Sequence, residues 1–458
     1  MTSLNSRREF MKRASALSAA GVAAPWALSM AAIGEAAAQS TPSDYKALVC
    51  VFLFGGNDHG NTLVPYDNAN YQNYASMRGG LTTSQALLTP TVLTPISALS
   101  DSRQYALAPE LAPLKSVFDA GRMGVLLNIG TLIQPTSSAQ YATRSVPLPP
   151  KLFSHNDQQS VWQASNPEGA LSGWGGRMGD LFAAGNSQAT FTAISAAGNA
   201  IYLSGNSVAQ YQVSRNGSVP INGIGSALYG SSAAAQALRA IIGNTPGNNN
   251  FESEYTRVVN RSIEANVSLT DALSKAPAVS TVFPATGLAA QLSMVARIIS
   301  ARNILGAKRQ VFFVSLGGFD THDNLVSEHG PLLAQVATAM KSFDDAMIAI
   351  GVSNQVTAFT ASDFGRTLSS NGDGSDHGWG GYHFVTGGAV KGKNFFGQAP
   401  LLGNGSPDDV GQGRLLPSMA VDQLAATLAT WMGVSPSNLR TVVPGIGNYS
   451  TQNLGLFA

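Results

Sequence analysis

Residues 309–323 read Arg-Gln-Val-Phe-Phe-Val-Ser-Leu-Gly-Gly-Phe-Asp-Thr-His-Asp, and the fold prediction starts from this stretch. The apolar run Val311 to Leu316 is too short for a buried helix and is typical of a strand covered on both faces. The two glycines after it let the chain turn sharply as it leaves the sheet. Ligands of open α/β sheets bind beyond the carboxyl ends of the strands, so Asp320 and His322 occupy a position typical of functional residues.

Two other apolar runs end in the same way. Residues 47–54 are followed by Gly-Gly-Asn-Asp, which ends at Asp58, and residues 356–360 are followed by Ala-Ser-Asp, which ends at Asp363. The apolar residues of 328–350 are mostly spaced by threes and fours, which predicts an amphipathic helix between two of these strands. We therefore expect an α/β fold with a mostly parallel central sheet.

The remaining elements are predicted from apolar runs and helix-boundary signals. We expect one domain over residues 39–458, with a helical and irregular insertion or cap at about 165–305. The further predicted strands are 124–129, 188–195 and 384–388. The further predicted helices are 111–120, one that begins near Ser154, 233–242, 251–275, 286–305 and 419–432.

Composition excludes several classes of protein. Of 458 residues, 44% are hydrophobic and 12% are charged, which suffices for a large core. Residues 1–38 hold four basic and two acidic residues, so the formal net charge of +1 becomes −1 without them, and no basic stripe indicates a nucleic-acid partner. Cys50 is the single cysteine, which excludes an intrachain disulfide and a multi-cysteine zinc site.

The N-terminus resembles a twin-arginine (Tat) signal peptide. Arg7-Arg8, with Phe10 and Lys12, precedes an Ala-rich stretch, and Ala36-Ala37-Ala38 offers a cleavage site. The resemblance implies the Tat translocase as a partner and a periplasmic or extracellular mature protein. The apolar stretch is Ala-rich and contains Pro25, so we expect no membrane anchor after cleavage of residues 1–38.

The three aspartates that follow predicted strands suggest a metal site. If the strands are parallel neighbours, Asp58, Asp320 and Asp363 share one sheet edge, and without evident basic partners they would repel one another. A divalent metal would relieve that repulsion. His322, with His377 or His383, would suit zinc or another transition metal, whereas carboxylates suit magnesium, calcium or manganese. The alternative is that each aspartate caps a helix or a turn.

Several other polar residues have more than one interpretation. Ser154 begins a predicted helix, where free backbone N–H groups favour an anion, and His155 is either functional or a partner of the helix cap. Arg366 either clamps an anionic substrate or pairs with Asp363. His59 and His329 are predicted to lie in a loop and on a helix surface.

Six motifs together resemble the DUF1501 family of Tat-exported bacterial proteins. That family is similar in its core to the alkaline phosphatase and sulfatase superfamily, which implies a three-layer α/β/α sandwich with a metal site at one sheet edge. The motifs are Gly-Gly-Asn-Asp at 55–58, Ser-His-x-Asp-x-Gln at 154–159, Gly-Gly-Phe-Asp-Thr-His at 317–322, Ser-Asp-Phe-Gly-Arg-Thr at 362–367, Asp-His-Gly-Trp-Gly at 376–380 and the segment 421–433.

The resemblance assigns expected roles to individual residues. Asp58 resembles the metal aspartate after the first strand, and Asp363 resembles the aspartate of the third motif. Asp320 and His322 fall in the segment that supplies an aspartate and a histidine. His377 stands at the last metal histidine.

The resemblance also implies a nucleophile, and the chain departs from the superfamily pattern at one expected histidine. Ser154 is the best-placed nucleophile, and Thr136 is a weaker one. Phe364 stands where a histidine commonly follows the third-motif aspartate, so a metal ligand is missing. The sulfatase pattern of Cys or Ser followed by x-Pro-x-Arg is absent, which argues against a formylglycine sulfatase.

We therefore predict an exported metal-dependent hydrolase-like protein that acts on phosphate or sulfate esters, with a small anionic ester as substrate. The alternative is a non-catalytic periplasmic binding or assembly protein that retains the fold.

Overall fold

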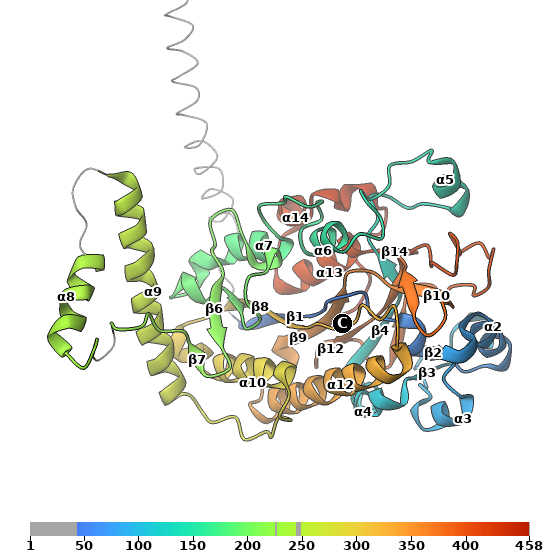
Figure 1. Cartoon of the computed structure of the whole chain (residues 1–458), viewed down its shortest axis with the longest axis horizontal. Coiled ribbons are helices and arrows are strands. Elements are labelled where there is room, and N and C mark those ends of the chain that lie inside the picture. The colour runs from blue at the N-terminus through green and yellow to red at the C-terminus, as the bar shows by residue number, and fades with distance from the viewer. Residues whose placement is uncertain (1–43, 225–226, 244–248, 458) are drawn as a thin grey trace, which may run out of the picture.

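A central sheet with helices on both faces forms the body of the molecule (Figure 1). The structure, a computed structural model, describes residues 44–224, 227–243 and 249–457, so the predicted signal peptide lies outside the described residues. This arrangement confirms the predicted three-layer α/β/α sandwich.

The central strand is β1 (Lys46–Leu53), which lies between β8 (Arg309–Leu316) and β9 (Val356–Ser362). It is parallel to both: Cys50 of β1 is aligned with Phe313 of β8 on one side and with Phe359 of β9 on the other. The three strands predicted to end in an aspartate are therefore adjacent, and their carboxyl ends share one edge of the sheet.

The outer strands extend the sheet on both sides. They are β4 (Met123–Gly130), β5 (Ala193–Ser195), β6 (Tyr211–Ser214), β7 (Gly217–Ser218), β12 (Gly381–Thr386), β13 (Asn394–Phe396) and β14 (Met419–Ala420). The strand order is β13-β4-β12-β9-β1-β8-β5-β6-β7, with β14 beside β4. β12 is antiparallel to both β4 and β9, so the sheet is mostly parallel with one reversed central strand.

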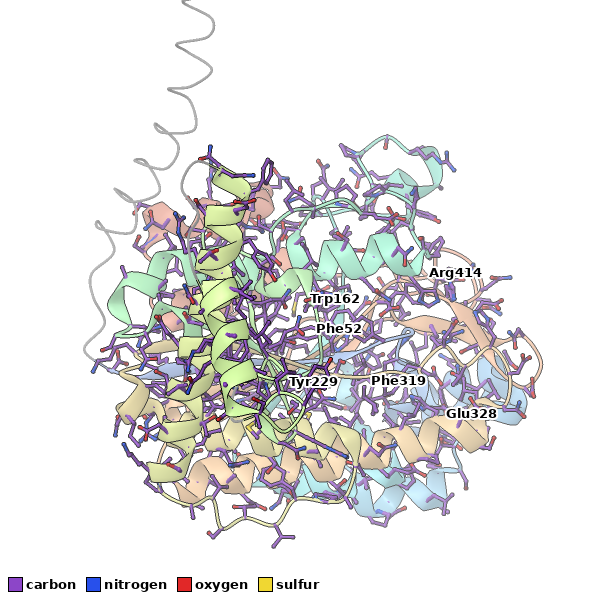
Figure 2. All side chains as sticks on the ribbon, turned by 60° about the vertical axis from the view of Figure 1, so that its left-hand side comes forward. Phe52, Trp162, Tyr229, Phe319, Glu328 and Arg414 are labelled. Atoms are coloured by element: carbon purple, nitrogen blue, oxygen red, sulfur yellow. The ribbon has the colours of Figure 1, made fainter. Side chains whose placement is uncertain are left out.

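Alternate side chains of β1 enter different layers of the core, as the period of a strand requires. Val49 and Val51 pack on the side of α4 (Ala112–Asp119), α10 (Gly287–Ser300) and α12 (Leu325–Ala349). Cys50 and Phe52 face the other side. The helices there are α6 (His155–Ala164), α7 (Trp174–Phe182), α13 (Val421–Met432) and α14 (Leu439–Val442), and Figure 2 labels Phe52 and Trp162 in this layer.

Part of the predicted insertion belongs to the central sheet and its helical layers, and another part projects from the body of the molecule. α7 and α10 cover opposite faces of the sheet, and β5 pairs with β8. The predicted strand 188–195 is shorter, because a 3-10 turn occupies residues 189–191. Two helices, α8 (Ser232–Gly243) and α9 (Asn250–Lys275), extend outward at the left of Figure 1.

Several smaller elements complete the fold. They are α2 (Asn68–Arg78), α3 (Gln85–Leu88), α5 (Ser138–Thr143), α11 (Arg302–Leu305), β2 (Leu63–Pro65), β3 (Tyr105–Leu107), β10 (Arg366–Ser370) and β11 (Ser375–His377). α13 stops at Gly433 as predicted, with a left-handed φ of +104°. Of the helices in the described ranges, none combines the length and the apolar character that crossing a bilayer demands.

Candidate metal centre

The exits of β1 and β8 touch one another at Gly55. The Gly55 amide donates to Asp363 Oδ2 at 3.1 Å, and its carbonyl accepts from Arg366 Nη1 at 3.0 Å. Gly55 has φ +116°, and a Cβ there would lie 2.3 Å from the backbone nitrogen of Asp320. Only glycine fits this turn, which brings the aspartates that follow β8 and β9 to one place.

Three histidines surround Asp320. His322 Nε2 lies 3.1 Å and His377 Nε2 lies 3.2 Å from Asp320 Oδ1, while His155 Nε2 lies 3.3 Å from Oδ2. His322 Nε2 and His377 Nε2 are 2.9 Å apart. The donor atoms of His155, Asp320 and His377 all lie within 4.8 Å of one another, which is close enough for one cation to bind them together.

Two of the imidazoles are oriented by fixed hydrogen-bond acceptors. His155 Nδ1 lies 2.6 Å from Asp363 Oδ2, and His377 Nδ1 lies 2.7 Å from the Phe153 carbonyl oxygen. A carboxylate and a carbonyl only accept, so each Nδ1 carries the hydrogen and donates it. Each Nε2 is then left for the space beside Asp320, as in metal sites where an outer acceptor fixes the ligand tautomer.

The sequence of α6 explains how His155 reaches Asp363. His155 and Gln159 are one helical turn apart and lie on the same face of the helix. Both donate to Asp363 Oδ2, Gln159 through Nε2 at 2.9 Å. The Phe364 ring lies beside both fixed imidazoles, with its centroid 5.0 Å from that of His155 and 4.6 Å from that of His377. The motif at 154–159 therefore positions a histidine.

The ionisation of the cluster follows from its neighbours. The hydrogen bond to Asp363 raises the pKa of His155. Burial lowers the pKa of His377, which favours the neutral ring that a metal needs. Burial opposes ionisation of Asp320, but the hydrogen bond and charge of Arg366 outweigh it, so the pKa of Asp320 is lowered.

Asp58 is held in a different way from the other two aspartates. Its carboxylate forms an ion pair with Arg78 of α2, and both side chains have no exposed surface. Burial raises the pKa of Asp58, but the Arg78 charge is among several that reverse this effect, so the net pKa is lowered. The expectation that the aspartates lack basic partners is therefore wrong for Asp58, because Arg78 comes from a helix that the strand pattern does not place.

Arg366 pairs with Asp320 and is fully buried. Its Nη1 donates to Asp320 Oδ1 at 2.9 Å, and its Nε donates to the Ser375 carbonyl at 3.1 Å. Asp320 thus has a basic partner too, which also contradicts the expectation. Since the side chain of Arg366 has no exposed surface, the predicted substrate clamp does not fit this position. The predicted alternative, pairing with Asp363, is replaced by pairing with Asp320.

Ser154 lies at the start of α6, as predicted, between Phe153, whose carbonyl accepts from His377, and His155. Its Oγ donates to Asp157 Oδ2 at 3.0 Å and caps no helix amide. Thr136 Oγ1 donates to the Gln134 carbonyl at 2.9 Å. His59 and His329 are 0% and 2% exposed. His59 packs edge-on against Tyr382 of β12, and His329 lies on a helix as predicted but on its buried face, with Nε2 3.0 Å from Asn57 Oδ1.

The structure brings together three of the five predicted metal ligands: Asp320, His322 and His377. Asp363 lies behind His155, and Asp58 lies in its ion pair with Arg78. The histidine that the sequence left open, His155, joins the cluster. The signal that would have found it is the spacing of His155 and Gln159, which places two donors on one helix face.

Comparison with known sequences identifies the family. The model of the family described as "Protein of unknown function (DUF1501)" matches residues 45–445. The chain belongs to the DUF1501 family. No curated protein matches it.

Solved structures resemble this DUF1501 chain weakly. Ps i-CgsB has 11% identity and a TM-score of 0.37, with 88% of this chain and 77% of that chain covered. The lipoteichoic acid synthase LtaP from Listeria monocytogenes has 8% identity and a TM-score of 0.35, with 92% and 79% covered. At these values the similarity does not bear on substrate or mechanism.

The donor atoms of the cluster fit a divalent cation. His155 Nε2 is buried and has no hydrogen-bond partner among the described residues, although it faces a carboxylate. Imidazole nitrogens with one carboxylate are ligands that zinc and other transition metals accept, whereas magnesium and calcium prefer a shell of oxygens. The cluster thus favours a transition metal over the oxygen-binding cations.

Proposed function

We propose that this protein is an exported, metal-dependent hydrolase of phosphate or sulfate esters. The observation that carries the proposal is the convergence of His155 Nε2 and His377 Nε2 on Asp320, with both Nδ1 atoms already held by acceptors. Two imidazoles whose orientation is fixed by outer acceptors are typical of a metal site, and packing alone does not require this arrangement. The motif resemblance to the alkaline phosphatase and sulfatase superfamily supports the choice of reaction.

In this proposal Ser154 is the nucleophile, and Asp157 and the start of α6 assist it. Ser154 attacks the phosphorus or sulfur atom of the ester, and Asp157, which already accepts the Ser154 hydrogen bond at 3.0 Å, takes its proton and passes it to the departing alcohol oxygen. Water then hydrolyses the ester formed on Ser154, which releases phosphate or sulfate and restores the hydroxyl group. The first amides of α6 bind the developing negative charge. A bound metal would supply the Lewis-acid charge that stabilises the reacting oxygens.

Arg414 replaces Arg366 as the proposed substrate cation. Its Nε donates to the His377 carbonyl at 2.8 Å, and its guanidinium lies 5.0 Å from the centre of the Phe153 ring. Arg414 is part-buried, whereas Arg366 has no exposed surface. An arginine at this place suits a phosphate or sulfate group.

The test is hydrolysis of aryl phosphate and aryl sulfate by the purified chain, with and without zinc or manganese. We expect one of the two esters to be cleaved only with metal. Ser154→Ala should abolish turnover and leave metal binding intact, whereas His377→Ala should abolish both. Cleavage that persists in Ser154→Ala or after chelation contradicts the proposal.

The second candidate is an exported binding or assembly protein without turnover. The burial of Arg366 favours it, because the arginine of the third motif is engaged by Asp320 and by Ser375 and cannot reach a substrate. Metal binding with no hydrolysis of either ester would support this second function.

We also propose that the mature protein acts in the periplasm or outside the cell. The Arg7-Arg8 signal favours Tat export, and recovery of the mature protein from the periplasm only when both arginines are present would support it. Recovery of Arg7→Lys/Arg8→Lys protein in the same fraction would contradict Tat export.

A further inference from the structure

Asp58 and Asp363 are completely enclosed by protein groups, whereas Asp320, which pairs with Arg366, keeps a side chain that is 45% exposed. Asp58 and Arg78 form a pair with no exposed surface on either side chain. If Asp58 bound a metal instead, the Arg78 guanidinium would stay buried without a carboxylate, which is strongly unfavourable. Arg78 Nη1 also donates to the Thr367 carbonyl at 3.1 Å, which fixes the guanidinium in place.

Asp363 is saturated on one oxygen and enclosed on the other. Its Oδ2 accepts from His155 Nδ1 at 2.6 Å, from Gln159 Nε2 at 2.9 Å and from the Gly55 amide at 3.1 Å. Its Oδ1 is buried and has no hydrogen-bond partner among the described residues. A metal on Oδ2 would have to displace three donors from two different segments, α6 and the exit of β1.

The space beside these aspartates is filled by an aromatic ring. Phe364 is 2% exposed and lies against both fixed imidazoles. A Cβ on Gly56 would lie 2.4 Å from the Phe364 ring, so the ring fits closely against the exit of β1. Phe364 has no donor atom, and its close packing leaves little room for an ion between the exit of β1 and the two imidazoles.

We propose that the centre binds one metal per chain, and that neither Asp58 nor Asp363 is a ligand. The metal is held by His155, Asp320 and His377, with His322 as the fourth ligand. Asp363 is a positioning residue that acts through His155 by fixing its tautomer, whereas Asp58 belongs to the buried ion pair with Arg78. This inference rests on the metal site of the proposed function but not on the hydrolysis.

The test is titration of the metal-free chain with zinc, followed by calorimetry and elemental analysis, and with Co²⁺ as a spectroscopic probe. We expect one tight equivalent of each ion and a cobalt spectrum with nitrogen ligands. Asp363→Asn should keep one equivalent, lower the affinity about 10- to 100-fold and shift the cobalt bands, because the amide then presents an uncharged acceptor to His155.

Asp58→Asn should keep one equivalent with an unchanged cobalt spectrum. Its matched control is Asp344→Asn, since Asp344 is also a buried aspartate paired with an arginine, Arg122, at 2.8 Å. If Asp58→Asn does not fold, the number of equivalents in the unaltered chain and the Asp363→Asn result still decide the question.

Two tight equivalents of zinc overturn the proposal, and so does an Asp58→Asn variant that loses as much affinity as Asp320→Asn. An absence of bound metal overturns it together with the hydrolase. One equivalent without cleavage of either ester leaves the single-metal centre correct and removes only the hydrolase.

Discussion

Asp320 receives side chains from four separate segments. Arg366 and His377 come from β10 and β11, His322 follows β8, and His155 opens α6. The carboxylate is the shared centre of these contacts, and its charge offsets that of a buried guanidinium as well as that of any bound cation.

We expect Asp320→Asn to weaken zinc binding by about 100-fold or more, beyond the usual effect of losing an outer acceptor. The control is Asp323→Asn, three positions further on, which removes the same charge from an exposed side chain. Titration calorimetry on both variants makes the comparison, and equal losses would contradict the assignment of Asp320.

Asp422 in the first turn of α13 provides a pH prediction. Burial raises its pKa from 3.8 to about 6. The folded chain therefore binds a proton that the unfolded chain has released between these values, so stability falls as the pH rises from 3.8 to about 6. Asp422→Asn should remove this loss.

At pH 8 the Asn variant should be more stable than the unaltered chain by up to about 3 kcal/mol, and near pH 4 the difference should vanish. Denaturant unfolding of both chains at pH 4, 6 and 8 measures it. A constant difference across the three values would show that the effect is packing and not ionisation.

The strand exit is the element that determines the site. Short continuous apolar runs predicted β1, β8 and β9 from sequence, and the glycines after β1 and β8 predicted the turns, because these features are local. The direction of β12 was not predictable, since a short buried run reads the same in parallel and antiparallel neighbours. The positions of Arg78 and Arg366 beside the aspartates depend on how α2 and β10 pack, which no local pattern specifies.

We expect Gly55→Ala to lower stability by about 3 kcal/mol or more and to weaken metal binding, because its φ is +116° and the added methyl group would meet the Asp320 backbone. Gly317→Ala is the matched control in the neighbouring exit, where a Cβ meets nothing within 4 Å. Thermal unfolding and zinc titration of both variants test the prediction, and equal behaviour of the two would contradict it.

At the scale of the whole molecule, buried histidines determine the response to acid. Burial lowers the pKa of His329 from 6.5 to about 4 and that of His383 from 6.5 to about 3. The unfolded chain takes up these protons first, so the contribution of both residues to stability is complete above pH 6.5 and is lost as the pH falls towards 4.

His383→Gln should therefore make unfolding less sensitive to pH between about 4 and 6.5. His383 Nδ1 lies 3.1 Å from Thr360 Oγ1, a contact that a glutamine amide can replace. Unfolding free energies at pH 4.5 and 7 for both chains measure the slope. An unchanged slope would mean that other groups control acid unfolding.

The central position of β1 has a consequence for synthesis. β1 is the first strand of the described residues, yet both of its neighbours, β8 and β9, lie at residues 309–316 and 356–362. At ribosomal speeds of about 5–20 residues per second, β1 waits roughly 10–50 s for its first partner. During that time a strand that is apolar on both faces has two unpaired edges, so we expect the nascent chain to need a holding chaperone until its last third emerges.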